Sequence, residues 1–181
     1  KPSLADTLLG WMWNWRRSGN GSDSARDTLE VLIEEREEAE VPIDDDERNM
    51  LANILELRGR PIHDVMIPRA DIVAVGRDTP VAKVIDTLTK GGHSRFPVFG
   101  ENLDDAVGMV HIKDVFAWRG HDPEFSLSKI QREILFVSPS MQVLELLLEM
   151  RTKRTHMALV VDEFGGVDGL VTIEDLVEEI V

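Results

Sequence analysis

The sequence predicts an α/β (α+β) fold, in which two β-α-β-β-α repeats pack as a pair and are preceded by N-terminal helices. Three observations lead to this prediction. From Arg60 onward, short β-branched runs alternate with helical segments. The same order of segments returns in the second half of the chain. A glycine and an aspartate recur at matching places in both halves, and two such units bury their apolar faces best against each other.

The repeat has a consistent register. The helix before the central hairpin recurs 62 positions later, with Val81, Ile85 and Leu88 matched to Val143, Leu147 and Met150. The hairpin and the next helix recur at 61, with Val98, Gly108 and Asp114 matched to Leu159, Gly169 and Asp175. The change from 62 to 61 predicts that one residue is lost after the helix.

Each repeat is expected to contain three strands and two helices. A strand at 65–67 is expected to lead into the first repeat. Within that repeat, strands are expected at 72–75, 96–99 and 106–111, and helices at 80–88 and 112–118. In the second repeat, strands are expected at 134–137, 157–161 and 169–172, and helices at 142–150 and 173–181. Gly91 and Gly92 end the helix expected at 80–88.

The first third of the chain has a different character. Residues 1–27 are expected to be irregular, residues 28–59 a helical linker, and the repeats to cover 60–122 and 123–181. Helices are expected at 24–40 and 43–57, the second with three aspartates at its start and Gly59 at its end. The tryptophans at 11, 13 and 15 suit either a membrane-interface anchor or a loosely ordered tail, and the tail is favoured. The chain begins without Met and ends in mid-pattern, so we expect it to be part of a longer one.

Composition excludes several classes of function. The 181 residues carry a formal net charge of −14, which argues against a nucleic-acid partner. No cysteine is present, so disulfides, thiolate metal sites and cysteine nucleophiles are excluded. No apolar run is long enough to span a membrane.

The most informative segment is 169–175. An apolar strand ends at Thr172, a helix begins at once, and Asp175 follows one turn later. Helix N-termini favour anions such as phosphate, and a carboxylate can accept hydrogen bonds from a ribose diol. The first repeat offers His111 and Asp114 at the same places. The alternative interpretation is an ordinary capping pair, since Thr followed by an acid three residues later is a capping signature.

A second segment of each repeat is polar and basic and leads into an apolar strand. Residues 92–98 are matched here to 153–159. Arg95, Arg154 and His156 suit phosphate groups, whereas Phe96 and Met157 suit an adenine ring. Core packing is the alternative role for the last two.

These segments together resemble the CBS domain pair of the CorC/hemolysin-C family of bacterial magnesium and cobalt efflux proteins. The resemblance covers about Ile43 to the end and rests on residues 65–72, 93–98, 107–114, 155–166 and 169–181. It implies a regulatory module that binds AMP, ADP or ATP, with Mg²⁺ only as an ion bridged by the nucleotide. It further implies a homodimer, attached to a membrane-spanning domain and a small C-terminal domain and exposed on the cytoplasmic face.

The resemblance also implies a set of nucleotide-binding residues. The ribose carboxylate falls on Asp114 and Asp175, and the hydroxyl position falls on Thr172 but on His111 in the first repeat. The adenine-side backbone falls near Met66, Ile67 and the segment from Ile134 to Phe136. The complete expected set is Met66, Ile67, Ser94, Arg95, Phe96, Pro97, His111, Asp114, Ile134, Phe136, Thr155, His156, Met157, Ala158, Thr172 and Asp175.

Two other classes of function remain as alternatives. The pair could be a structural dimerisation module without a ligand. A hydrolytic enzyme is less favoured, because the five histidines lack metal-ligand spacing and neither a Walker loop nor a nucleophile elbow is present. We therefore expect no catalytic residues and no metal ion bound by the protein itself.

Overall fold

A computed structural model describes residues 44–118 and 125–181 of the chain. It divides the chain into one unit from Lys1 to Leu55 and another from Glu56 to Val181. The expected irregular segment 1–27, the helix at 24–40 and the tryptophan cluster lie outside the described residues. The expected helix at 43–57 is present as α3 (Asp45–Glu56). Its start is closed by Asp44 and Glu47, each of which accepts the backbone N–H of the other through its carboxylate.

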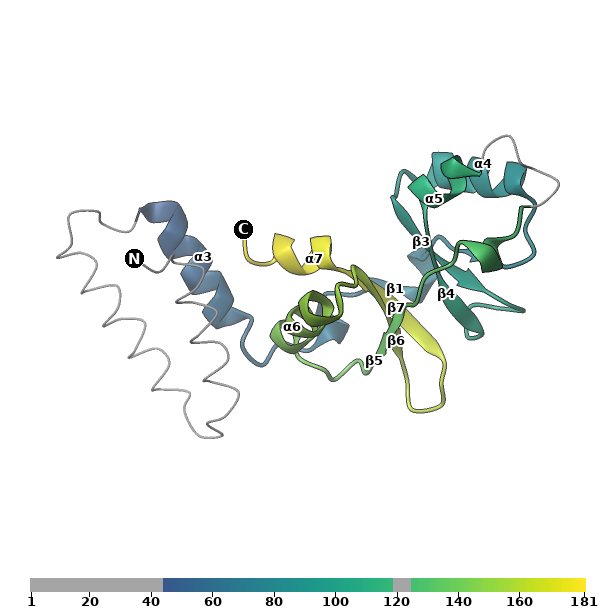
Figure 1. The fold of residues 1–181 in the computed structure, drawn as a ribbon. Helices are drawn as coiled ribbons and strands as arrows, with labels where there is room; N and C mark the ends of the chain where they lie inside the picture. Colours follow the sequence, from purple (N-terminus) through teal and green to yellow (C-terminus); the bar gives the residue numbers. More distant parts are fainter. Residues whose placement is uncertain (1–43, 119–124) are drawn as a thin grey trace. The chain divides into compact units, whose positions relative to one another are not determined.

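The second unit contains both predicted repeats, and the predicted α/β fold of two paired repeats is confirmed (Figure 1). A leading segment carries β1 (Ile67–Pro68). The first repeat is formed by β2 (Val75–Gly76), α4 (Val81–Gly91), β3 (Arg95–Phe99), β4 (Ala106–His111) and α5 (Ile112–Ala117). The second is formed by β5 (Leu135–Val137), α6 (Val143–Lys153), β6 (Met157–Val161), β7 (Val167–Thr172) and α7 (Ile173–Glu178).

Several expected boundaries were wrong by a few residues. The strand expected at 65–67 begins only at Ile67, because residues 62–64 form a 3-10 turn. The strand expected at 72–75 is β2, which starts at Val75 after a second 3-10 turn over Arg69–Asp71. The helix expected to end at 88 continues to Gly91, and Gly92 caps it in the left-handed conformation with φ 68°.

The two repeats form one small sheet each. In the first sheet the strand order is β2-β3-β4, with β2 parallel and β4 antiparallel to β3. In the second the order is β1-β7-β6-β5, with β5 parallel and β7 antiparallel to β6. Each repeat thus joins a parallel β-α-β crossover to an antiparallel hairpin, with helices beside the sheet (Figure 1).

The predicted register needs one correction. Val98 pairs with Gly108, whereas it is Val160, and not Leu159, that pairs with Gly169. The offset of 62 therefore continues through the helix cap and the first hairpin strand. The missing residue lies in the hairpin turn, which spans 100–105 in the first repeat and only 162–166 in the second.

The repeats exchange their leading segments. β1 precedes the first repeat but pairs with β7 of the second, with Ile67 opposite Leu170. Conversely, Arg132 precedes the second repeat but bridges to Met109 of β4 in the first. The recurring glycines make room for these crossings, since a Cβ on Gly169 would lie 2.7 Å from Ile67 O and one on Gly108 would lie 2.5 Å from Arg132 O.

Buried side chains form a core within the first repeat and another between the repeats. The first cluster unites β2, α4, β3, β4 and α5 through Val75, Val84, Leu88, Phe96, Val98, Val110 and Val115, with Leu127. The second places Met109 of β4 against Met157, Leu159, Val167 and Leu170 of β6 and β7. The two repeats therefore share apolar surface, as the repeat pattern predicted.

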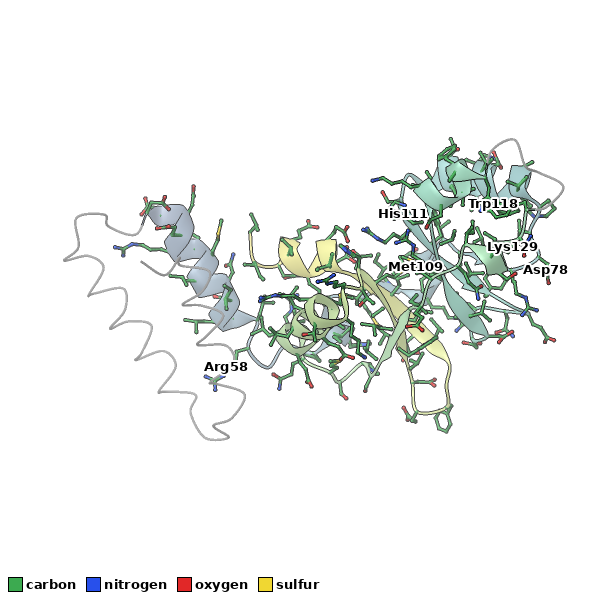
Figure 2. All side chains as sticks on the ribbon, in the orientation of Figure 1. Arg58, Asp78, Met109, His111, Trp118 and Lys129 are labelled. Carbon is green, nitrogen blue, oxygen red and sulfur yellow. The ribbon has the colours of Figure 1, made fainter. Side chains whose placement is uncertain are left out.

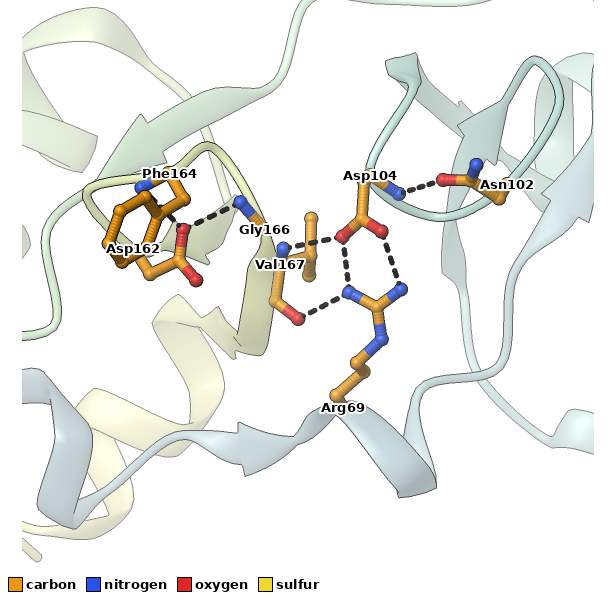
Figure 3. Close-up of polar contacts among 7 residues, drawn as sticks. All are labelled: Arg69, Asn102, Asp104, Asp162, Phe164, Gly166 and Val167. Atoms are coloured by element: carbon orange, nitrogen blue, oxygen red, sulfur yellow. Dashed lines mark hydrogen bonds and ion pairs between the residues drawn. The ribbon is translucent and has the colours of Figure 1, made fainter.

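A polar contact also links the repeats at their hairpins (Figure 3). Arg69 Nη2 donates to Asp104 Oδ2 at 2.9 Å, and Arg69 Nη1 donates to Asp104 Oδ1 and to Val167 O. Val167 N donates to Asp104 Oδ1 at 2.8 Å. Asp104 thereby ties the turn of the first hairpin to the first residue of β7.

Candidate functional site: two related clefts

Two clefts lie where the repeats meet. The first, which we call the Thr172 cleft, has a volume of about 310 Å³. Its lining comes from β1 and the segment after it, the starts of β3 and β6, and the junction of β7 with α7. The residues are Ile67, Asp71, Ile72, Val73, Gly92, His93, Ser94, Arg95, Pro97, Met157, Leu170, Thr172, Glu174 and Asp175.

Thr172 and Asp175 form a capping box at the start of α7. Asp175 N donates to Thr172 Oγ1 at 3.3 Å, and Asp175 Oδ2 accepts from the backbone N and the hydroxyl of Thr172, both at 2.8 Å. The capping role that the sequence left open is therefore present. It uses one oxygen of the Asp175 carboxylate; within the described chain, Oδ1 takes no hydrogen bond and remains an acceptor for a ligand.

The helix start itself offers less to an anion than the sequence suggested. Ile173 N already donates to His156 O at 3.1 Å, and Asp175 N donates to Thr172. Of these first amides, only that of Glu174 is left for a ligand. Phosphate recognition in this cleft would therefore depend on side chains.

Arg95 is the cation of the Thr172 cleft. Its Nη1 donates to Glu174 Oε1 at 2.9 Å, and its side chain is only 19% exposed. The guanidinium is thus held at the cleft wall by a carboxylate that a phosphate group would have to displace or share.

Six residues in the lining of the Thr172 cleft are apolar, and together we call them its apolar wall: Ile67, Ile72, Val73, Pro97, Met157 and Leu170. Ile67 and Leu170 face each other across the β1–β7 pair, so the exchanged strand builds part of this wall. An apolar wall with a few polar groups at one end is the usual composition of a site for a planar organic ligand.

The second cleft, which we call the His111 cleft, is larger, about 630 Å³, and much more basic. Met109 and His111, two residues apart on β4 and labelled in Figure 2, are both in its lining. The full lining is Arg95, Met109, His111, Lys113, Asp114, Arg132, Glu133, Lys153, Arg154, Thr155, His156 and Met157. Arg95 and Met157 are shared with the Thr172 cleft.

The polar groups of the His111 cleft are arranged differently. Asp114 makes no capping box, because both of its oxygens accept hydrogen bonds from Arg132: Nε to Oδ2 and Nη2 to Oδ1, each at 2.9 Å. This contact raises the pKa of Arg132 further above its usual range. His111 Nδ1 caps α5 by accepting from Lys113 N at 3.0 Å. Partial burial and, next, the nearby Arg95 lower the pKa of His111, which favours the neutral ring; because Nδ1 accepts from Lys113 N, the ring proton of that form is on Nε2.

The expected binding residues fall into three groups. Ile67, Ser94, Arg95, Pro97, Met157, Thr172 and Asp175 line the Thr172 cleft. His111, Asp114, Thr155 and His156 line the His111 cleft. Met66, Phe96, Ile134, Phe136 and Ala158 line neither: the side chains of Phe96 and Ala158 are fully buried, Phe136 is 52% exposed, and Ile134 packs on the cluster between the repeats.

The sequence did not predict two residues that form hydrogen bonds with the expected binding side chains. Arg132 donates to Asp114, and Glu174 accepts from Arg95. Glu174 lies within the segment 169–175, but it could have been recognised as a neighbour of Arg95 only once the packing of the two repeats was known. Arg132 had no sequence signal, since it lies in the exchanged segment before β5.

The 44–118 and 125–181 segments contain no group of three or more His, Asp or Glu side chains arranged to hold a metal ion. In the same segments, every helix is too short or too polar to cross a bilayer.

Comparisons with known proteins agree with this architecture. The CBS domain family model matches residues 62–120 and 127–181. A "Hemolysin C homolog" of Rickettsia rickettsii is 47% identical over 137 residues, which are 75% of this chain and 46% of the relative. The chain thus spans about half the length of that curated relative.

Solved structures are similar as well. The CBS domain of a bacterial CNNM/CorC family Mg²⁺ transporter matches with a TM-score of 0.75 and 35% identity, over 86% of this chain and 94% of that one. The corresponding structure in complex with ATP has a TM-score of 0.70 and 36% identity, over 74% and 96%. A CBS-domain pair with bound AMP from Klebsiella pneumoniae has a TM-score of 0.58 and 30% identity, over 66% and 97%. This chain therefore belongs to the CBS domain family, and its two repeats form a CBS pair homologous to those of hemolysin C and CNNM/CorC Mg²⁺ transporter proteins.

Proposed function

We propose that this CBS pair is a regulatory module that binds an adenine nucleotide, AMP or ATP, in the Thr172 cleft. The observation that carries the proposal is that Asp175, whose Oδ1 takes no hydrogen bond within the described chain, lines a cleft together with apolar residues and Arg95. A nucleotide presents a matching group for each: a ribose diol for the carboxylate, a planar base for the apolar residues and phosphate for the arginine.

Each part of the nucleotide has a partner in this arrangement. The ribose hydroxyls donate to Asp175, with the Thr172 hydroxyl beside them. The base lies against the apolar wall that includes Ile67 and Leu170. The phosphates reach Ser94 and Arg95. Homologous CBS pairs that contain bound ATP or AMP support the choice of an adenine nucleotide as the ligand.

Magnesium enters this proposal only with the nucleotide. The described residues offer no three-ligand cluster for a metal ion, so Mg²⁺ would be held by the phosphates, which suits a cation that keeps much of its water shell. No residue of the pair is assigned a catalytic role.

The regulated activity is proposed to be ion transport. Relatives described as CNNM/CorC Mg²⁺ transporters carry such a pair. By analogy, this pair would adjoin a membrane-spanning domain and a small C-terminal domain at the cytoplasmic face of a bacterial magnesium or cobalt efflux protein. The nucleotide would act by binding one arrangement of the repeats more tightly than another.

Helices α5 and α7 support pairing with a second copy. Phe116 and Val177 occupy equivalent positions on these helices, and each is 43% exposed. Two exposed apolar residues at matched positions suit a symmetric dimer contact. If no ligand binds, this contact would favour the alternative function, a dimerisation module.

Isothermal titration with ATP and AMP, with and without Mg²⁺, tests the nucleotide site. Asp175→Asn keeps a capping oxygen but removes the charge, so we expect affinity to fall about tenfold or more, as for a lost charged hydrogen bond. Asp114→Asn is the matched control, because that carboxylate is already occupied by Arg132, and should leave affinity within about twofold.

Three results would contradict the proposal. Absence of both heat and thermal shift at millimolar nucleotide would favour the dimerisation module. An equal loss in both variants would remove the assignment to the Thr172 cleft. Sustained phosphate release that disappears in Asp175→Asn would identify an enzyme instead.

A further inference from the structure

The two clefts are built on the same frame, so their residues can be compared position by position. Ile67 pairs with Leu170 in one, and Arg132 pairs with Met109, the counterpart of Leu170, in the other. The residue two positions after the helix cap is Glu174 in one and Lys113 in the other. The C-cap of the crossover helix is Gly92 in one and Arg154 in the other.

All three differences add positive charge to the His111 cleft. An isoleucine, a glutamate and a glycine in the Thr172 cleft correspond to arginine, lysine and arginine here. This basic cleft occurs in a chain with a formal net charge of −14. Positively charged side chains are therefore concentrated in this cleft although the net charge of the chain is negative, and such a local concentration favours an anionic ligand.

Arg154 adds a conformational argument. It adopts φ 54°, whereas the equivalent Gly92 adopts φ 68°. Among the described residues it is the sole non-glycine with positive φ, a region that side chains disfavour. Glycine would fit this cap without strain, so the arginine contributes something other than stability to the helix end, and it lines the cleft.

The same cleft is poorly equipped for ribose. Both oxygens of Asp114 are bonded to Arg132, in contrast to the free Oδ1 of Asp175. Thr155, beside Arg154, has a buried hydroxyl with no hydrogen-bond partner in the described chain. Cations are thus available, while the carboxylate at the position equivalent to Asp175 is already occupied.

We propose that the His111 cleft is a separate anion site, whose ligand carries several phosphate groups and is bound through Lys113 and Arg154 without a ribose contact. Arg132 contributes charge while its guanidinium remains on Asp114. The site is independent of the nucleotide proposed for the Thr172 cleft, apart from the shared Arg95 and Met157.

Titration with inorganic triphosphate, free of nucleoside and of Mg²⁺, tests this site. We expect the wild-type protein to bind one equivalent. Arg154→Gly should weaken binding about tenfold or more, because a charge-assisted contact is lost. The midpoint of thermal unfolding should stay the same or rise, since glycine relieves the positive φ. That combination separates a ligand-binding role from a structural one.

Arg151→Gln is the matched control, because it removes one charge from the same helix outside the cleft lining. Affinity should stay within about twofold of wild type. In ¹⁵N–¹H correlation spectra, the largest shifts on addition of triphosphate should fall at residues 111–114 and 153–156. Equal affinity of Arg154→Gly and wild type, an equal loss in Arg151→Gln, or shifts centred on 172–175 would each overturn the proposal.

Discussion

At the scale of single residues, the position two residues after each helix cap sets the charge of its cleft. Glu174 and Lys113 occupy this place in the two repeats. Glu174 accepts a hydrogen bond from Arg95, which lines both clefts, so it reduces the positive charge that a phosphate group meets in the Thr172 cleft. It should therefore limit nucleotide affinity.

Glu174→Gln is expected to tighten ATP binding by about two- to fivefold. The reason is that an ion pair with one exposed partner contributes roughly 0.2–1 kcal/mol, and removing it makes Arg95 available to the phosphates. Isothermal titration at low salt measures the change. Glu178→Gln, on the same helix and without a contact to Arg95, controls for the lost charge and should have a smaller effect. A weaker affinity in Glu174→Gln would mean that this carboxylate itself contacts the ligand.

At the scale of elements, the hairpin of the first repeat is joined to β7 by Asp104 (Figure 3). The hydrogen bond from Arg69 and then that from the Val167 backbone lower the pKa of Asp104 to about 2, from its ordinary value of 3.8. Because the folded-state pKa is depressed, the stabilisation is present in full above the unfolded value and is lost as the pH falls through about 2.

Asp104→Asn should therefore lower the free energy of unfolding at pH 6, and the difference from wild type should narrow as the pH falls from about 4 toward 2. Urea unfolding at pH values between 6 and 2.5 measures this. Asp86→Asn is the control, since Asp86 forms an exposed pair with Lys90 within α4 and has no part in the link between elements. A difference that stays constant over this range would show that the charge of Asp104 does not stabilise the link.

At the scale of the whole molecule, the repeat pattern was enough to predict the fold. Short apolar runs located β4 and β6 at their observed bounds, and the recurring Gly108 and Gly169 marked equivalent places in the two sheets. Helical spacing reports which face of a helix is buried, and here Val84 and Leu88 of α4 and the equivalent Leu146 and Met150 of α6 are all buried.

The exchange of leading segments could not be predicted in the same way. The segments around Ile67 and Arg132 make few regular hydrogen bonds and have no periodicity of their own, so only tertiary pairing identifies their partners. For the same reason, only part of the candidate site could be predicted from the sequence. Thr172 and Asp175 form a recognisable motif, whereas the hydrogen bonds from Arg132 to Asp114 depend on the exchange of segments.

The exchange and the shared apolar cluster predict that the two repeats unfold together. Met109 of β4 is 6% exposed and packs against residues of β6 and β7. Met109→Ala should lower the free energy of unfolding by roughly 2–5 kcal/mol, as for other large-to-small changes in a core. Hydrogen exchange followed by NMR measures this at amides of β3 in the first repeat and of β6 in the second.

Both sets of amides should lose protection by the same amount, because each sheet contains a segment that precedes the other repeat. Met50→Ala is the control for loss of a methionine at an exposed place, since Met50 is 39% exposed on α3, and it should change stability by about 0.5 kcal/mol or less. If the protection of β3 falls while that of β6 is kept, the repeats unfold separately. In that case the exchanged segments would contribute little to cooperativity, and a nucleotide in one cleft would have no route through the core to the other repeat.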